Sequence, residues 1–187
     1  FDRITRPEQI LVALPRAIGV MTDPASCGPT CLALPQDVQT MAFDCPASFL
    51  SPAPLRIRRP APDAHELAAA NELLTNARRP LVVAGGGVLY SQAGATLAAW
   101  ATAHGVPVAE TQAGKGSVAW DHALNAGAVG VTGSPAANAL AAEADLVIAI
   151  GTRLQDFSTA SHTLWPKARL LCLNVAPMDA AKWSGQA

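Results

Sequence analysis

The sequence predicts an α/β fold with a doubly wound parallel sheet. Two observations support this prediction. From Asp63 onward, short apolar runs alternate with segments of helical periodicity, a pattern typical of repeated strand-helix units. Each apolar run also ends in glycine or polar residues, as expected where buried parallel strands open into loops.

The first part of the chain, residues 1–41, reads as the end of a preceding α/β domain. Pro7–Val20 has the spacing of an amphipathic helix with proline in its first turn, and Thr30–Leu34 is a short apolar run closed by Pro35. One helix and one strand cannot form a sheet of their own. The apolar pattern is already running at Phe1, so we expect a piece of a longer protein.

Residues 42–62 have no periodic pattern and are expected to form an extended linker. Prolines exclude regular helix through most of this stretch; they are Pro46, Pro52, Pro54, Pro60 and Pro62.

Residues 63–187 are expected to form the main domain. Asp63, with Glu66 three residues later, is a candidate N-cap. We expect Leu146–Ile150, an unbroken apolar run, to be the central strand. The predicted helices are 63–78, 92–104, 134–142 and one beginning near Met178, and the predicted strands are 81–84, 106–109, 146–150 and 170–175.

Composition excludes several classes of partner. The formal net charge is -1, 14% of the 187 residues are charged and no Lys/Arg run occurs, which argues against nucleic acid. Every apolar run is too short to cross a bilayer, so we expect no membrane association and a cytoplasmic protein. The cysteines lack paired metal spacing and are expected to be buried, reduced thiols; they are Cys27, Cys31, Cys45 and Cys172.

Two glycine-containing strand ends are candidate ligand sites. Gly85–Gly87 lies between a predicted strand and a helix, where backbone N–H groups can approach a pyrophosphate. Gly151 and Arg153 follow the predicted central strand. The dinucleotide fingerprint is incomplete because Tyr90 replaces its third glycine, so a tight turn is the alternative interpretation.

No complete catalytic apparatus is present. Gly114-Lys115 fails as a P-loop because Gly116 replaces the Ser/Thr that would hold magnesium. His122 and His162 lack a recognisable nucleophile or orienting acid, so structural hydrogen bonding is the better interpretation of both. We therefore predict neither a catalytic residue nor a metal ligand in this chain.

Several stretches resemble a known family, namely Phe1–Gln9, Leu32–Gln39, Val83–Val88, Pro107–Gly116 and Gly151–Phe157. They are similar to the thiamine diphosphate-dependent enzymes of the acetolactate synthase superfamily, in particular to a branch that hydrolyses a carbon-carbon bond of a cyclic 1,2-diketone in inositol catabolism. The resemblance covers essentially the whole chain.

The resemblance implies a homo-oligomeric parent enzyme with pyrimidine-binding, central and diphosphate-binding domains that uses thiamine diphosphate and magnesium. This chain would hold the end of the first domain, the linker and most of the second. No Gly-Asp-Gly occurs in it, so the chain alone is expected to be inactive and to depend on the other domains. Gln39 is placed near the active site, with a hydrogen bond at a strand end as the equal alternative.

In flavin-containing relatives the resemblance would map an FAD or ADP site onto Gly85, Gly86, Gly87, Thr111, Gln112, Gly151 and Arg153. Two departures, Phe157 and Asn174, indicate an empty nucleotide fold, because Asn174 replaces a carboxylate that would meet adenosine hydroxyls. The alternatives are therefore an FAD- or ADP-binding module and, ranked last, an NAD-dependent deacylase of similar fold, whose usual zinc module the cysteine spacing does not offer.

Overall fold

The structure, a computed structural model, describes residues 1–51 and 54–182. The chain forms two compact units, residues 1–60 and 61–187. Each unit has its own hydrophobic core.

The first unit contains a two-stranded parallel sheet and one long helix. Strands β1 (Asp2–Arg3) and β2 (Leu32–Ala33) pair in parallel, and helix α1 (Ile10–Thr22) connects them after the 3-10 turn η1 (Pro7–Gln9). The expectation of no separate sheet is therefore wrong, because the two residues of β1 are too few to show a strand pattern. Two further 3-10 turns follow, η2 (Val38–Thr40) and η3 (Ala47–Leu50).

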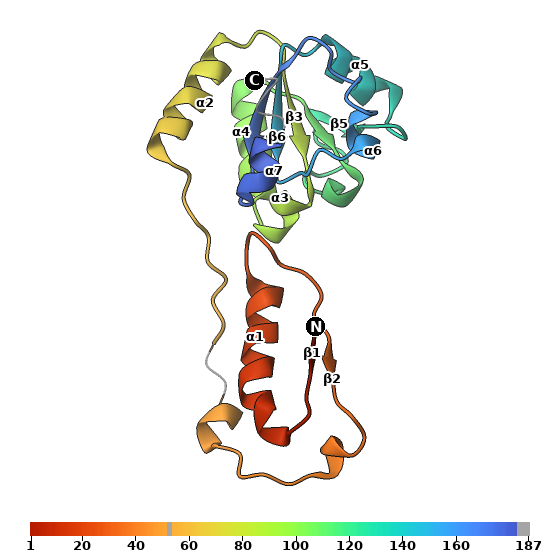
Figure 1. The fold of residues 1–187 in the computed structure, drawn as a ribbon. Helices are drawn as coiled ribbons and strands as arrows, with labels where there is room; N and C mark the ends of the chain where they lie inside the picture. The colour runs from red at the N-terminus through yellow and green to blue at the C-terminus, as the bar shows by residue number, and fades with distance from the viewer. Residues whose placement is uncertain (52–53, 183–187) are drawn as a thin grey trace. The chain divides into compact units, whose positions relative to one another are not determined.

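The second unit alternates strands and helices along the chain (Figure 1). Its elements are α2 (Ala64–Asn76), β3 (Pro80–Ala84), α3 (Gly86–Tyr90), α4 (Gly94–His104), β4 (Val108–Glu110), η4 (Gln112–Gly114), β5 (Asn125–Ala128), α5 (Pro135–Glu143), β6 (Leu146–Ile150), α6 (Asp156–Thr159), β7 (Arg169–Leu173) and α7 (Pro177–Ala181).

The five strands of this unit form one parallel sheet in the order β5-β4-β3-β6-β7. The predicted doubly wound parallel fold is confirmed. The predicted central strand is wrong, because β3 occupies the middle and β6 lies beside it. Both strands are apolar and buried on both faces, so composition alone could not decide which is central.

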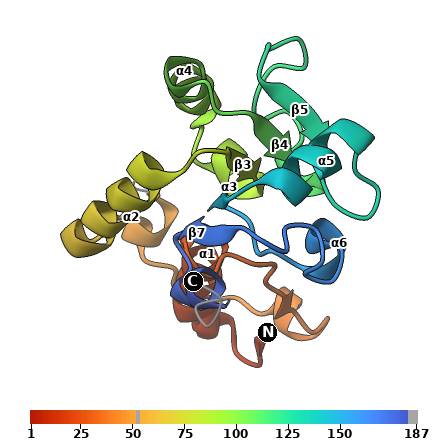
Figure 2. The ribbon, with the colours of Figure 1, turned by 90° about the horizontal axis from the view of Figure 1, so that it is seen from above.

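Side chains alternate between the two faces of the sheet. Leu81 and Val83 of β3 join the core cluster that includes α5, whereas Val82 and Ala84 join the cluster that includes α4. Helices α4 and α5 accordingly lie on opposite sides of the sheet (Figure 2). The sheet is therefore covered on both faces, as parallel sheets require.

The expectation that the cysteines are buried is wrong for all four residues. Cys27 and Cys31 are exposed, and Cys45 and Cys172 are half-buried, although all four are free thiols. Cys27 and Cys31 lie between α1 and β2, outside the core of the first unit. In the described ranges, no helix combines the length and the apolar character that crossing a bilayer would require.

Candidate functional site

The candidate site lies where the winding of the sheet reverses. β3 and β6 are neighbours, yet the chain leads from β3 to β4 on one side and from β6 to β7 on the other. In open α/β sheets, the loops after two such strands diverge and leave a crevice that binds ligands. Here β3 is followed by Gly85 and by the start of α3 at Gly86 and Gly87, and β6 is followed by Gly151–Arg153.

Backbone atoms close this crevice. The N–H of Gly85 donates to the carbonyl of Ile150 at 2.8 Å, and the N–H of Gly87 donates to the carbonyl of Gly151 at 2.9 Å. A Cβ atom on Gly87 would lie 2.6 Å from Cα of Gly151. Two N–H groups expected to meet a pyrophosphate are thus bonded within the sheet edge, and the glycines allow one loop to pack on the other.

The loop after β4 packs onto the same edge. The N–H of Thr111 donates to the carbonyl of Ala84 at 2.9 Å, and its Oγ1 accepts from the N–H of Gly114 at 3.2 Å. A Cβ on Gly86 would lie 3.3 Å from the carbonyl oxygen of Ala113. Thr111 is buried and Gln112 is exposed, so of these two predicted site residues only Gln112 has an accessible side chain.

The polar side chains at this edge have partners within the chain. Arg153 Nε lies 3.4 Å from the Asp179 carboxylate on α7. Asn174 Nδ2 donates to the carbonyl of Thr152 at 3.0 Å, and its Oδ1 accepts from the N–H of Ala176 at 3.0 Å. A carboxylate at position 174 could not donate to Thr152. The predicted residues therefore lie together, but they do not form an open cradle that fits FAD or ADP.

Glu110 is a buried polar residue at the same edge that sequence reasoning missed. Only 5% of it is exposed, and its Oε1 accepts from the N–H of Val118 at 3.0 Å. The carboxylate therefore anchors the returning end of the loop that carries Thr111 and Gln112. A glutamate at the end of the apolar run 106–109 was the available sequence signal.

His122 has a structural role, as its hydrogen bonds show. Its Nδ1 accepts from the N–H of Leu124 at 3.2 Å, so the proton of a neutral ring resides on Nε2. Nε2 lies 3.0 Å from Thr102 Oγ1, whose hydroxyl donates to the carbonyl of Ala98 at 2.9 Å. The ring thereby links the loop before β5 to α4.

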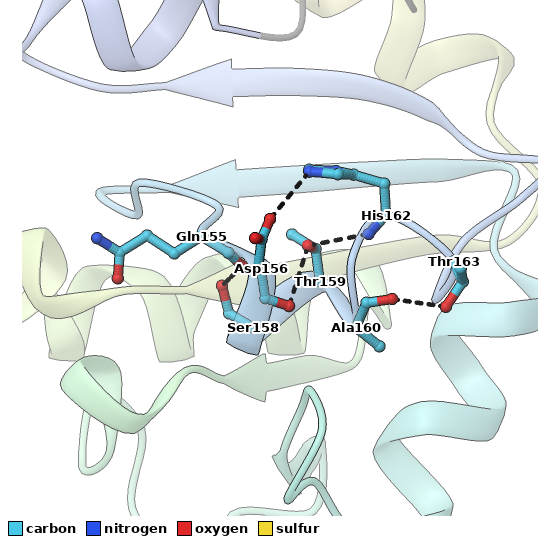
Figure 3. Close-up of polar contacts among 7 residues, drawn as sticks. All are labelled: Gln155, Asp156, Ser158, Thr159, Ala160, His162 and Thr163. Carbon is cyan, nitrogen blue, oxygen red and sulfur yellow. Dashed lines mark hydrogen bonds and ion pairs between the residues drawn. The ribbon is translucent and has the colours of Figure 1, made fainter.

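His162 belongs to a polar turn that follows α6 (Figure 3). Its Nε2 lies 3.7 Å from an Asp156 oxygen, and its N–H donates to Oγ1 of the buried Thr159 at 3.1 Å. Ala160, Ser161 and His162 all have positive φ angles, of 47°, 52° and 65°. These contacts stabilise a left-handed turn that non-glycine residues rarely adopt.

Gln39, in the first unit, is exposed and its Nε2 donates to the carbonyl of Leu34 at 2.6 Å. Leu34 directly follows β2, so the alternative predicted for this residue, a hydrogen bond at a strand end, is present. In the part of the chain that the structure covers, no group of three or more His, Cys, Asp or Glu side chains is placed to hold a metal ion.

A separate hollow lies at the opposite, amino edge of the sheet. Leu81 and Pro107 contribute apolar lining, and Arg79 and Glu143 contribute charge. Arg79 Nη1 lies 3.3 Å from a Glu143 oxygen, and both side chains are largely exposed. None of the predicted site residues lines this hollow.

The fold and this edge together define a Rossmann-like domain of the parallel α/β class. Residues 67–184 match the family model described as thiamine pyrophosphate enzyme, central domain. The chain therefore belongs to the thiamine pyrophosphate enzyme family.

Curated relatives extend the similarity beyond the central domain. A 3D-(3,5/4)-trihydroxycyclohexane-1,2-dione hydrolase of Clostridium perfringens is 44% identical over 194 residues, covering 100% of this chain and 30% of its own length. The Bacillus subtilis enzyme of the same name is 46% identical over 184 residues, covering 97% of this chain and 29% of its own length. The chain thus spans about 30% of the length of these relatives.

A solved structure agrees with this assignment. The X-ray structure of a Mycobacterium smegmatis protein, described as thiamin diphosphate-dependent, matches with a TM-score of 0.69 and 25% identity. The match covers 96% of this chain and 34% of that chain.

Proposed function

We propose that the chain is the central part of a thiamine diphosphate-dependent enzyme that hydrolyses a carbon-carbon bond of a cyclic 1,2-diketone in inositol catabolism. The observation that carries this proposal is 44% identity across 100% of the chain to a relative named as such a hydrolase. When bound, thiamine diphosphate supplies the electron sink for the bond cleavage.

We further propose a division of labour along the chain. Residues 1–41 belong to the pyrimidine-binding domain, residues 42–62 are the linker and residues 63–187 belong to the central domain. In support, α1 with β1 and β2 forms a small α/β unit, and the family match begins at residue 67. Under this proposal the chain itself provides scaffold, and Gln39 is the residue nearest to the active site.

Thiamine diphosphate and magnesium would be held outside this chain. The chain contains no Gly-Asp-Gly sequence, and its described residues provide no cluster of metal ligands. The proposal therefore expects a Gly-Asp-Gly motif elsewhere in the complete gene product. It also implies a cytoplasmic homo-oligomer. Size-exclusion chromatography with light scattering of the complete gene product would test the oligomeric state.

An FAD- or ADP-binding module is the weaker alternative. The N–H groups of Gly85 and Gly87 are bonded to carbonyls, and Arg153 is paired with Asp179. Calorimetric titration of the chain with ADP and with FAD should give no binding heat at high micromolar ligand. Saturable heat with either ligand would restore the alternative. The relatives described above are named as hydrolases of a cyclic dione and not as deacylases.

The proposed reaction is tested with the complete gene product. Hydrolysis of 3D-(3,5/4)-trihydroxycyclohexane-1,2-dione should require both thiamine diphosphate and magnesium, and residues 1–187 alone should show none. The variant Gln39→Ala should lower turnover if Gln39 lies near the reacting groups, whereas Gln36→Ala, at another exposed glutamine of the first unit, serves as the matched control. A complete product that is inactive on the diketone but active on 2-oxo acids would replace the proposed substrate while keeping the family.

A further inference from the structure

The side chain of His122 joins α4 to the start of β5. The ring is half-buried, and its Nε2 lies 3.0 Å from Oγ1 of Thr102 on α4. Its Nδ1 accepts from the N–H of Leu124, the residue before β5, at 3.2 Å. The carbonyl of Leu124 in turn accepts from the N–H of Val108 in β4 at 2.8 Å. The two ring nitrogens therefore connect a helix to the point where β5 begins to pair with the sheet.

Both ring contacts require an uncharged imidazole with its proton on Nε2. The Thr102 hydroxyl has one proton, which it donates to the carbonyl of Ala98 at 2.9 Å, so its oxygen accepts from Nε2. Nδ1 carries no proton because the N–H of Leu124 donates to it. In the imidazolium ion both ring nitrogens are donors. Protonation would therefore set one N–H group against another and remove the hydrogen bond at Leu124.

No acidic side chain offsets this loss. The titratable residues on the elements around the ring are His104 on α4, Glu110 on β4, and Lys115 and Asp121 in the loop before β5. The Glu110 carboxylate accepts from the N–H of Val118 at 3.0 Å. Among the residues that the structure describes, no carboxylate lies within ion-pair distance of the His122 ring. The neutral ring is thus favoured by its hydrogen bonds, and the charged ring has no ion-pair partner.

The connection ends at a strand that has few other contacts to hold it. β5 lies at the edge of the sheet, and none of its four residues is buried. Its register with β4 shifts between Val108 and Ala109, and such irregularities disrupt the ladder of hydrogen bonds locally. Release of Leu124 from the ring would therefore act where β5 enters the sheet.

We propose that His122 is a pH-sensitive link, which secures the start of β5 to α4 while its ring is neutral and releases it when the ring gains a proton. Histidine is the side chain that ordinarily changes charge between about pH 5 and 8. Protonation breaks the hydrogen bond from Leu124, whereas Nε2 still donates to Thr102. This link is separate from the proposed hydrolase reaction, and its test does not depend on activity.

The test is amide hydrogen exchange of the complete gene product, measured by mass spectrometry at about pH 7.5 and about pH 5.5, within the range where histidine changes charge. Labelling times are scaled for the pH dependence of intrinsic exchange. Protection of a peptide that covers residues 119–126 should fall by about two- to tenfold at the lower pH, the effect of one lost hydrogen bond. Protection of β6 (Leu146–Ile150) should not change, and at the higher pH it verifies that each variant is folded.

Two variants assign the pH response to one ring. His122→Asn keeps an acceptor for the N–H two residues later but cannot titrate, so exchange in the peptide should become independent of pH. His104→Asn removes the other titratable ring on α4 and is the matched control, which should keep the wild-type response.

Three results would overturn the proposal. The first is unchanged protection of residues 119–126 at the lower pH in the wild type. The second is a wild-type pH response in His122→Asn. The third is a parallel loss of protection in β6, because that result would indicate general unfolding by acid.

Discussion

Two features of the structure require glycine at position 151: a left-handed backbone conformation and a close contact with another backbone segment. Its φ angle is 58°, and a Cβ atom there would lie 2.6 Å from Cα of Gly87. Gly105 has a similar φ angle of 64°, but a Cβ there would meet nothing within 4 Å. Comparison of Gly105 with Gly151 therefore separates the cost of a left-handed backbone conformation from the cost of placing a side chain where two backbone segments touch.

We expect Gly105→Ala to lower the free energy of unfolding by about 1–2 kcal/mol, the usual cost of a left-handed alanine. Gly151→Ala should lower it by more than about 3 kcal/mol, because the new methyl group also forces the two loops apart. Urea unfolding monitored by circular dichroism measures both values. Equal losses in the two variants would mean that the loops separate without cost.

Asp145 connects the start of β6 to the start of β3. Its two oxygens accept from the N–H groups of Arg78 and Arg79 at 2.8 and 2.9 Å. Desolvation works to raise the pKa of Asp145, but the hydrogen bonds from Arg78 and Arg79 lower it below its ordinary value. Because the pKa is lowered in the folded state, the stabilisation is present above the unfolded pKa and is lost as the pH falls through the folded pKa.

At neutral pH, Asp145→Asn should cost about 1–3 kcal/mol of unfolding free energy, because its amide group cannot accept both N–H bonds. The difference from the wild type should shrink once the pH falls below about 4, where the carboxylate begins to be protonated. Urea unfolding across this pH range gives the measurement. Glu143→Gln, in the exposed pair with Arg79, is the control and should change stability by less than about 1 kcal/mol at any pH.

Residue types near the site could be predicted from the sequence, but their contacts could not. The positions of Gly85, Gly151 and Arg153 at strand ends followed from the apolar runs before them. That Gly87 meets Gly151, or that Arg153 pairs with Asp179, depends on which strands are neighbours. Strand order is a long-range property that no local pattern contains.

At the scale of elements, capping residues fix where two helices begin. Asp63 accepts from the N–H groups of His65 and Glu66 at the start of α2. Ser134 accepts from the N–H of Ala137 at the start of α5, and its hydroxyl also donates to the carbonyl of Ala126 in β5. Asp63 thus caps only its own helix, whereas Ser134 also links its helix to the sheet.

We expect Asp63→Ala to cost about 1 kcal/mol of unfolding free energy, the usual loss at an N-cap. Ser134→Ala should cost more, about 2 kcal/mol, because it also leaves the Ala126 carbonyl without this donor. Asp63→Asn and Ser134→Thr keep an acceptor and should retain most of the stability. Thermal unfolding of the four variants measures the order, and a larger loss for Asp63→Ala would contradict it.

Elements with strong periodicity were predicted closely, and short ones were missed. Leu146–Ile150 was predicted with its observed bounds, and Asp63 is confirmed as the N-cap of α2. β5 was missed because Asn125–Ala128 contains no β-branched or aromatic residue. The short helices α3 and α6 were also missed, because one turn of helix is too brief to show a period.

At the scale of the molecule, the two units differ in the size of their cores. The cluster in the first unit has three buried members, Ile4, Ala13 and Val38. The second unit has a five-stranded sheet covered on both faces. A unit of residues 1–60 with so small a core is marginally stable by itself, whereas a covered five-stranded sheet is an ordinary domain.

Residues 61–187 expressed alone should therefore unfold cooperatively with heat, whereas residues 1–60 alone should show no cooperative transition. Differential scanning calorimetry of the two pieces tests this expectation, and amide hydrogen exchange provides an independent measurement. A sharp calorimetric peak for residues 1–60 would show that the first unit folds without further chain.

The contact between Gly87 and Gly151 also limits how this domain can change during evolution. The two loops meet through backbone atoms, so a side chain at Gly87 or Gly151 would separate them only at a cost in stability and would itself fill the space that it opened. Insertion or deletion of residues in one loop is the shortest route to a new ligand there. Variation in loop length after β3 or β6 should therefore separate ligand-binding members of this family from ligand-free ones.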